Sequence, residues 1–134
     1  ILVYACLYSG ISFADECEKP VAREVSVQGT VESQKAGEAE WQEVKLNDTY
    51  CPGDTIRVHG KSRADVTLLE KSVIRLNQNT IITLETPKDE KTGVIDMLKG
   101  AAHFFSSGPE SLDVKTPFTT AGVRGTEFLV TVEE

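Results

Sequence analysis

Apolar and polar residues alternate in short stretches that recur about every ten residues, with Gly, Asn, Asp or Pro between them. Such alternation places successive side chains on opposite faces of an extended strand. Helical periodicity is almost absent after Ala14. The pattern therefore predicts an all-β fold, an antiparallel β-sandwich or β-roll of about ten to twelve short strands.

The expected strands cover residues 22–27, 30–33, 43–46, 54–58, 64–69, 73–76, 80–84, 93–97, 102–105, 112–115, 118–120 and 126–132. Consecutive strands between residues 54 and 84 could stack as rungs of a roll, but no rung repeats strictly enough to identify a solenoid. The choice between sandwich and roll therefore stays open. The residues expected to face the core are Val25, Val27, Val31, Val44, Leu46, Ile56, Val58, Val66, Leu68, Ile74, Leu76, Ile82, Leu84, Ile95, Met97, Phe104, Leu112, Val114, Phe118, Phe128 and Val130.

Residues 116–130, TPFTTAGVRGTEFLV, are the most informative part of the chain. Two short strands flank Gly122 and Gly125, and these glycines bracket Arg124 at a spacing that suits a tight turn with positive φ. In such a turn Arg124 is either a clamp for local carboxylates and carbonyls or an exposed recognition point. The clamp is favoured, because turn arginines more often satisfy nearby acceptors than bind ligands. It predicts that Arg124→Ala lowers stability more than it lowers binding.

Length and charge narrow the classes of protein. The chain has 134 residues, of which 40% are hydrophobic, and its formal net charge is -7. This describes one globular domain with a sizeable core. No basic patch is present to neutralise phosphates, so we expect no nucleic-acid partner.

The chain starts with an uncharged apolar stretch, residues 1–14, and a charged run follows from Asp15 onward. Small residues at Ser12 and Ala14 match the positions that a signal peptidase reads, so we expect a truncated signal peptide at 1–14 and the exported domain at 15–134. The alternatives are the tail of a transmembrane helix, which needs ~20 apolar residues, and lipidation at Cys6, where the preceding residues faintly resemble a lipobox. We expect no membrane insertion of the mature domain.

Removal of the signal peptide would leave Cys17 and Cys51 as an even pair. In an oxidising compartment such a pair favours a disulfide, here one that ties the N-terminal arm to the turn before residue 54. The alternative is a pair of free, buried thiols.

Residues of the catalytic and metal-binding types form no recognisable set. His59 and His103 have no His, Cys or carboxylate partner at metal-ligand spacing, and no phosphate loop or nucleophile elbow occurs. We therefore expect no enzyme, no metal site and no cofactor. Asp54, after Pro52-Gly53, is expected to accept turn N–H groups.

Three arginines, Arg57, Arg63 and Arg75, fall in neighbouring expected strands and could line one face with Arg124. Pairing with acidic residues across strands is the preferred interpretation, and the expected partners are Asp54, Asp65 and Glu70. Trp41 and Tyr50 flank the 44–48 segment. Trp41 could be a ligand platform, although an aromatic residue that caps the end of a β core is commoner.

The motifs resemble one known family. Residues 116–130 look like the closing motif of the FecR domain, which is named for a bacterial periplasmic regulator of iron uptake. A second stretch agrees with it: the turn at Gly53-Asp54 with its strand, the strand begun by Ser62, and the strand that ends at Asn77. The likeness covers about residues 21–132 in the right order, and several motifs in order are a specific signal.

The resemblance implies a non-enzymatic periplasmic sensing or protein-interaction module in an envelope signal relay. Some family members regulate a sigma factor in response to a siderophore-loaded outer-membrane transporter. Those regulators carry a cytoplasmic segment and a transmembrane helix before the domain, whereas a cleavable signal is predicted here, so the chain looks more like the exported subgroup. The expected partner is an envelope protein or an attached downstream module. The alternative is a carbohydrate- or peptidoglycan-binding β-module that uses Trp41.

Overall fold

The structure is a computed structural model that describes residues 17, 19–68, 72–89, 91–106, 111–124 and 127–132. The predicted signal peptide at 1–14 lies outside them. The strands are β1 (Ala22–Gln28), β2 (Val31–Gln34), β3 (Trp41–Glu43), β4 (Thr49–Tyr50), β5 (Thr55–Val58), β6 (Arg63–Leu68), β7 (Ser72–Leu76), β8 (Thr80–Leu84), β9 (Thr92–Ser106), β10 (Ser111–Lys115), β11 (Thr120–Arg124) and β12 (Glu127–Val132). The all-β prediction is confirmed.

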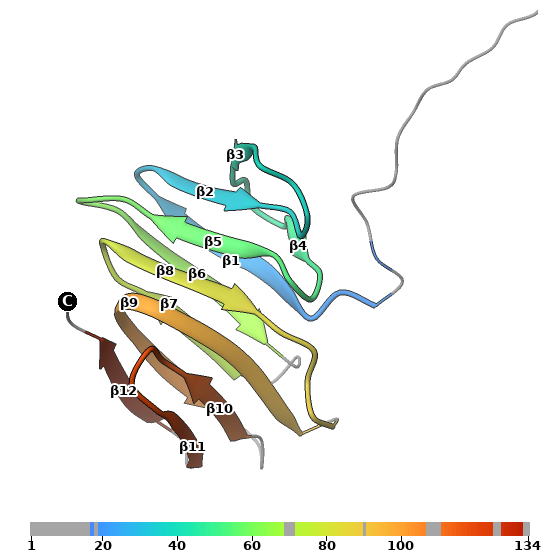
Figure 1. The fold of residues 1–134 in the computed structure, drawn as a ribbon. Helices are drawn as coiled ribbons and strands as arrows, with labels where there is room; N and C mark the ends of the chain where they lie inside the picture. Colours follow the sequence, from blue (N-terminus) through green and yellow to red (C-terminus); the bar gives the residue numbers. More distant parts are fainter. Residues whose placement is uncertain are drawn as a thin grey trace, which may run out of the picture.

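The strands form two sheets that share β9 (Figure 1). Sheet A has the order β4-β1-β6-β7-β9-β12, and sheet B has the order β3-β2-β5-β8-β9-β10-β11. The first half of β9 pairs with β8 and β10 in sheet B, and its second half pairs with β7 and β12 in sheet A. All these strand pairs are antiparallel except β9 with β10. The two sheets are therefore halves of one curled sheet, which is the roll form of the predicted fold.

Successive rungs of this roll stack through the corners at which the chain passes from one sheet to the other. The Thr30 amide donates to the Ser62 hydroxyl (2.8 Å), which joins the β1–β2 corner to the β5–β6 corner. The Lys61 amide donates to the Gln78 side chain (2.8 Å) in the β7–β8 corner. In the same corner, the Asn77 amide donates to the carbonyl of Ala101 in β9 (3.0 Å). Because each of these corners is hydrogen-bonded to the next, the curl is fixed from the β1–β2 corner to β9.

The bend inside β9 requires glycine. Gly100 has a φ of 104°, and a Cβ atom added there would lie 2.7 Å from the Cβ of Thr80. The Thr80 hydroxyl bonds to both the amide and the carbonyl of Ala101. The sequence suggested two separate strands at 93–97 and 102–105, but the structure has one bent strand of 15 residues, because glycine lets the ladder turn without ending.

The core lies between the two halves of the curl. Its buried hydrophobic side chains are Ala22, Val31, Val44, Tyr50, Ile56, Val58, Ala64, Val66, Leu68, Ile74, Leu76, Ile82, Leu84, Ile95, Met97, Ala102, Phe104, Leu112, Val114 and Val132. Most of the predicted inward set is confirmed. The side chain of Phe128 lies outside the described part.

Three predicted core residues are exposed, namely Val25 (36%), Leu46 (59%) and Phe118 (76%). The prediction for Val25 is wrong because a β-bulge between Glu24 and Ser26 changes the alternation, so that Glu24 faces the core instead. Leu46 follows the third strand, which covers 41–43 and not 43–46. Phe118 lies in the turn between β10 and β11.

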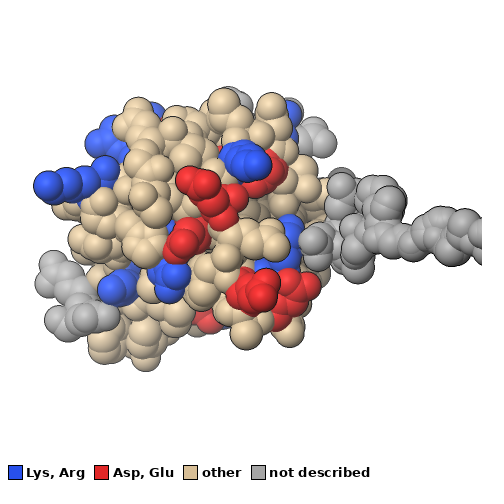
Figure 2. All heavy atoms as spheres, turned by 90° about the horizontal axis from the view of Figure 1, so that it is seen from above, with Lys and Arg blue, Asp and Glu red and all other residues tan. Residues whose placement is uncertain are grey.

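The first rung of the roll consists of β1 and β2. Its outer end is covered by β3, β4 and the segments beside them (Figure 1). Figure 2 looks onto this end and shows acidic and basic side chains interspersed with uncharged surface. Both edge strands are short here, with three residues in β3 and two in β4. Across the described residues, no helix is long and apolar enough to cross a membrane.

Candidate interaction site

The residues that the sequence singles out lie in separate parts of sheet B. Trp41 is in the edge strand β3, Asp54 precedes β5, and Gly122 is in β11 at the opposite edge. Five strands separate β3 from β11. At ~4.8 Å per strand spacing, these residues are too far apart to form one site.

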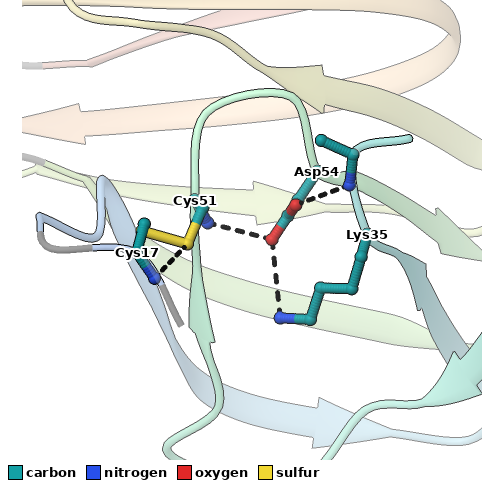
Figure 3. The surroundings of a disulfide bond; sticks show 5 residues. Cys17, Lys35, Cys51 and Asp54 are labelled. Carbon is teal, nitrogen blue, oxygen red and sulfur yellow. Dashed lines mark hydrogen bonds and ion pairs between the residues drawn. A yellow bond between two sulfur atoms is a disulfide. The ribbon is translucent and has the colours of Figure 1, made fainter. Parts of the chain in front are cut away.

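The Asp54 side chain joins its own turn to the β2–β3 loop, at the side where the disulfide lies (Figure 3). Its side chain is 2% exposed, and its Oδ2 accepts the Cys51 amide at 2.9 Å. Its Oδ1 accepts the Ala36 amide at 3.0 Å, and Lys35 Nζ lies 3.6 Å from Oδ2. As the sequence predicts, the carboxylate accepts turn N–H groups. A buried, fully engaged carboxylate of this kind stabilises the fold and is not available to a ligand.

The Cys17–Cys51 disulfide is present, with a Cα–Cα distance of 5.8 Å. The Cys17 amide also donates to the Sγ of Cys51 (3.1 Å). Because the Cys51 amide bonds to Asp54, the disulfide joins the N-terminal arm directly to the Asp54 network. Free thiols, the alternative left open by the sequence, do not apply to this pair.

Position 53, next to Asp54 in this network, requires glycine for conformational and steric reasons. Its φ is 96°, and a Cβ atom would lie 2.7 Å from the Cβ of Ala36. Its amide donates to the Leu84 carbonyl, and the Leu84 amide donates to the Asp54 carbonyl (2.9 Å). The Gly-Asp pair therefore brings the β2–β3 loop and β8 close to the start of β5.

The predicted tight turn at 122–125 is wrong for residues 122–124, and Gly125 lies outside the described residues. Gly122 and Arg124 lie in β11, paired with Asp113 and Ser111 of β10. The described turn in this part of the chain lies at 116–119, between β10 and β11, where the Thr116 amide donates to the Thr119 carbonyl. Gly122 has no positive φ, and a Cβ there would lie 3.2 Å from an Asp113 carboxylate oxygen, a close contact with the end of a side chain.

The two strands at the end of the chain do not form a hairpin with each other. β11 extends sheet B by pairing with β10, whereas β12 pairs with β9 in sheet A. Among the described residues β11 has no second partner strand, so one of its edges is open. Gly125 and the side chain of Arg124 lie outside the described part, and the clamp remains a prediction.

Trp41 takes part in a cluster on the outer face of sheet B. The Arg57 guanidinium lies 3.8 Å from the centre of the Trp41 ring, and its Nη2 donates to Oε1 of Glu32 at 2.7 Å. The same oxygen lies 2.7 Å from Nε2 of His59. The hydrogen bonds from Arg57 and His59 lower the pKa of Glu32. The cluster is an ion-pair network supported by a cation–π contact, and it covers one face of the indole.

The proposed arginine stripe does not form. Arg57 lies in sheet B, whereas Arg63 and Arg75 lie in sheet A. The preferred interpretation, pairing with acidic residues across strands, holds for Arg75, whose Nε lies 3.2 Å from Asp65. Arg57 pairs with Glu32 and not with Asp54.

The structure contains a buried acid that the sequence analysis missed. Glu24 is 0% exposed, and the Tyr50 hydroxyl donates to its Oε1 at 2.7 Å. Its Oε2 is buried without a hydrogen-bond partner. Burial raises the pKa of Glu24 to about 7, against an opposing effect of the Tyr50 hydrogen bond, and the charges of Asp65 and Asp48 raise it slightly further. The β-bulge that turns Glu24 inward left no clear signal in the alternation.

A comparison with protein families decides the identity of the chain. The model of the family described as FecR protein matches residues 54–134, more than half of the chain. The chain belongs to the FecR protein family. The FecR family is a regulatory and sensing family. No curated protein and no solved structure shows a significant match to the chain.

The FecR family model matches a shorter stretch of the chain than residues 21–132, over which the motifs resemble the family. It starts at Asp54 and takes in β5 to β12, so that β1 to β4 lie before it. These four strands complete the first rung and cover its end. Among the described residues, no group of three or more His, Cys, Asp and Glu side chains could hold a metal ion.

Proposed function

We propose that this FecR-family chain is an exported module of the bacterial envelope that relays a signal by binding a protein partner. Membership of a regulatory family carries the proposal. The Cys17–Cys51 disulfide supports export, because such bonds persist in oxidising compartments such as the periplasm. The partner is an envelope protein or a module attached to the same chain.

A pull-down from isolated bacterial envelopes tests this function. The bait is the oxidised chain, and the matched control is the Cys17→Ser/Cys51→Ser variant, which lacks the disulfide. We expect one or a few envelope proteins to be recovered in stoichiometric amounts by the oxidised chain. Recovery at the level of empty beads would argue against a role in protein binding.

Localisation is tested separately, with the full-length natural protein tagged at its C-terminus. We expect it in the periplasmic or envelope fraction, with the disulfide formed before lysis as shown by thiol trapping. A reduced protein in the cytoplasmic fraction would contradict export.

A carbohydrate- or peptidoglycan-binding role is the second candidate, and Trp41 is the residue that suggests it. Arg57 already occupies one face of the indole, so a sugar ring could stack on at most the other face. Sedimentation with purified sacculi distinguishes the two functions. Binding that is lost in Trp41→Ala would favour the second candidate, whereas no sedimentation would remove it.

A further inference from the structure

Phe118 is the most exposed large hydrophobic side chain among the described residues, at 76%. It lies in the turn between β10 and β11, at the last rung of the roll. The opposite, covered end has its own exposed apolar residue, Leu46, at 59%. Phe118 and Leu46 therefore both offer an accessible apolar side chain, but the backbone around Phe118 differs from that around Leu46.

The turn that carries Phe118 is held by a network centred on Thr116. The Thr116 hydroxyl accepts the amides of Phe118 (3.1 Å) and Thr119 (3.0 Å). The Thr116 amide and hydroxyl both donate to the Thr119 carbonyl, at 2.8 and 3.0 Å. Pro117 restricts the same backbone further. Because the turn is fixed in advance, ordering it would cost little on binding.

The strand that follows this turn, β11, has an open edge; among the described residues β12, which pairs only with β9, has one too. Thr120, Ala121 and Gly122 of β11 are exposed and uncharged, and β11 pairs only with β10 among the described residues. The edge at the other end of sheet B differs, because β3 is a three-residue strand with Glu40 before it and Glu43 at its end. Short edges with charges at both ends resist the addition of another strand. β11 is longer, with five residues, and its only charged residue is Arg124 at its end, so its first four positions permit such addition.

We propose that β11 receives an extended strand of a protein partner, and that Phe118 anchors that strand at the end of sheet B. The proposal rests on the proposed function in that it names the surface through which the partner binds. A row of open backbone N–H and C=O groups is complemented by another extended backbone. Phe118 adds a fixed aromatic side chain of the kind that dominates interface energetics.

The chemistry of the edge favours a protein over other occupants. A lipid tail offers no hydrogen bonds to backbone groups, and a net charge of -7 disfavours an anionic membrane surface or a nucleic acid. The partner strand should place an apolar side chain beside Phe118. Its other side chains should be small or β-branched, to match Thr120, Ala121 and Gly122.

A peptide panel tests the proposal without the natural partner. The probes are fluorescein-labelled peptides of about ten residues, in which Thr and Val alternate with Ser and one Leu is moved along the sequence. Binding to the oxidised full chain is measured by fluorescence anisotropy, and the bound segment is located by amide hydrogen exchange. We expect at least one peptide to bind and to protect residues 120–124.

The matched variants are Phe118→Ser and Leu46→Ser, which remove exposed apolar side chains at opposite ends of the roll. We expect Phe118→Ser to weaken binding about tenfold or more, and Leu46→Ser and Phe118→Trp to leave it nearly unchanged. The melting temperatures of all variants check that each is folded. Equal binding by Phe118→Ser, protection on β3 or β12 in place of β11, or no binding by any peptide would overturn the proposal.

Two further outcomes separate this proposal from the proposed function. If Phe118→Ser recovers the envelope partner as well as the unchanged chain does, the function stands and the anchor is wrong. If the peptides bind as expected and no envelope protein is recovered, the assignment of β11 as a strand-binding edge is supported and the proposed function is contradicted. A dimer of the chain that Phe118→Ser dissociates would overturn the proposal in favour of a second copy.

Discussion

The Tyr50 hydroxyl donates a 2.7 Å hydrogen bond to Oε1 of Glu24 inside the core of the roll. The other carboxyl oxygen of Glu24 is buried without a partner. Burial also raises the pKa of Tyr50, so the phenol remains a donor across the accessible pH range. A carboxyl group in this setting is stable when protonated and costly when charged.

The stability of the fold should therefore depend on pH through Glu24. Its pKa rises from 4.5 to about 7 in the folded state, so between these values the folded chain holds a proton that the unfolded chain has lost. This contribution is fully present below about pH 4.5 and is lost as the pH rises through about 7. Its size is on the order of 3 kcal/mol. Urea unfolding of the chain and of Glu24→Gln at several pH values measures it.

Comparing the unchanged chain with Glu24→Gln cancels the contributions of the other acids to the pH dependence of stability. As the pH rises from about 5 to about 8, we expect the free energy of unfolding of Glu24→Gln to increase relative to that of the unchanged chain. A constant difference across that range would mean that Glu24 titrates normally.

Tyr50→Phe should destabilise the fold by about 1–3 kcal/mol, because it leaves Oε1 of Glu24 without a donor. The loss should be larger at high pH, where the carboxylate is charged, than at low pH. Denaturant unfolding measures both values. A loss that is the same at both ends of the pH range would contradict a bond to a titrating carboxyl.

Removal of the disulfide by Cys17→Ser/Cys51→Ser should lower the free energy of unfolding by roughly 3–4 kcal/mol, because the bond closes a loop with a sequence separation of 34 residues. The oxidised full chain should show one free thiol, Cys6, and the reduced chain three. Three thiols before reduction would contradict the bond.

Glycine substitutions separate backbone conformation from steric fit. Gly37 and Gly100 both have positive φ, but a Cβ meets nothing within 4 Å at Gly37 and clashes with Thr80 at Gly100. Gly37→Ala should therefore cost about 1 kcal/mol and Gly100→Ala at least about 2 kcal/mol more, measured by urea unfolding. Equal costs would show that the corner at Gly100 yields to the added methyl group.

The sequence predicted the fold class well because alternation reports burial directly. Ile56 and Val58, for example, alternate with polar residues and are buried as expected. The prediction fails where the backbone departs from a regular strand. The bulge after Glu24 exchanges the inward and outward positions of β1, and a period of two cannot show a bulge.

Prediction of the site was less complete, because it depends on which strands become neighbours. Gly53-Asp54 could be assigned to a turn from local chemistry alone. The glycines at 122 and 125 suggested a turn between two strands of one hairpin, but β11 and β12 belong to different sheets. Phe118 was placed in the core by hydrophobicity, whereas a turn held by Thr116 keeps it in solvent.

The central claim is that a protein partner binds at β11 and Phe118. Site-specific photo-crosslinking in the exporting cell tests it most directly, with a photoreactive phenylalanine analogue at position 118 or, as the control, at position 46. The account predicts a discrete adduct with an envelope protein from position 118 and none from position 46. No adduct at 118, or the same adduct from both positions, would contradict it.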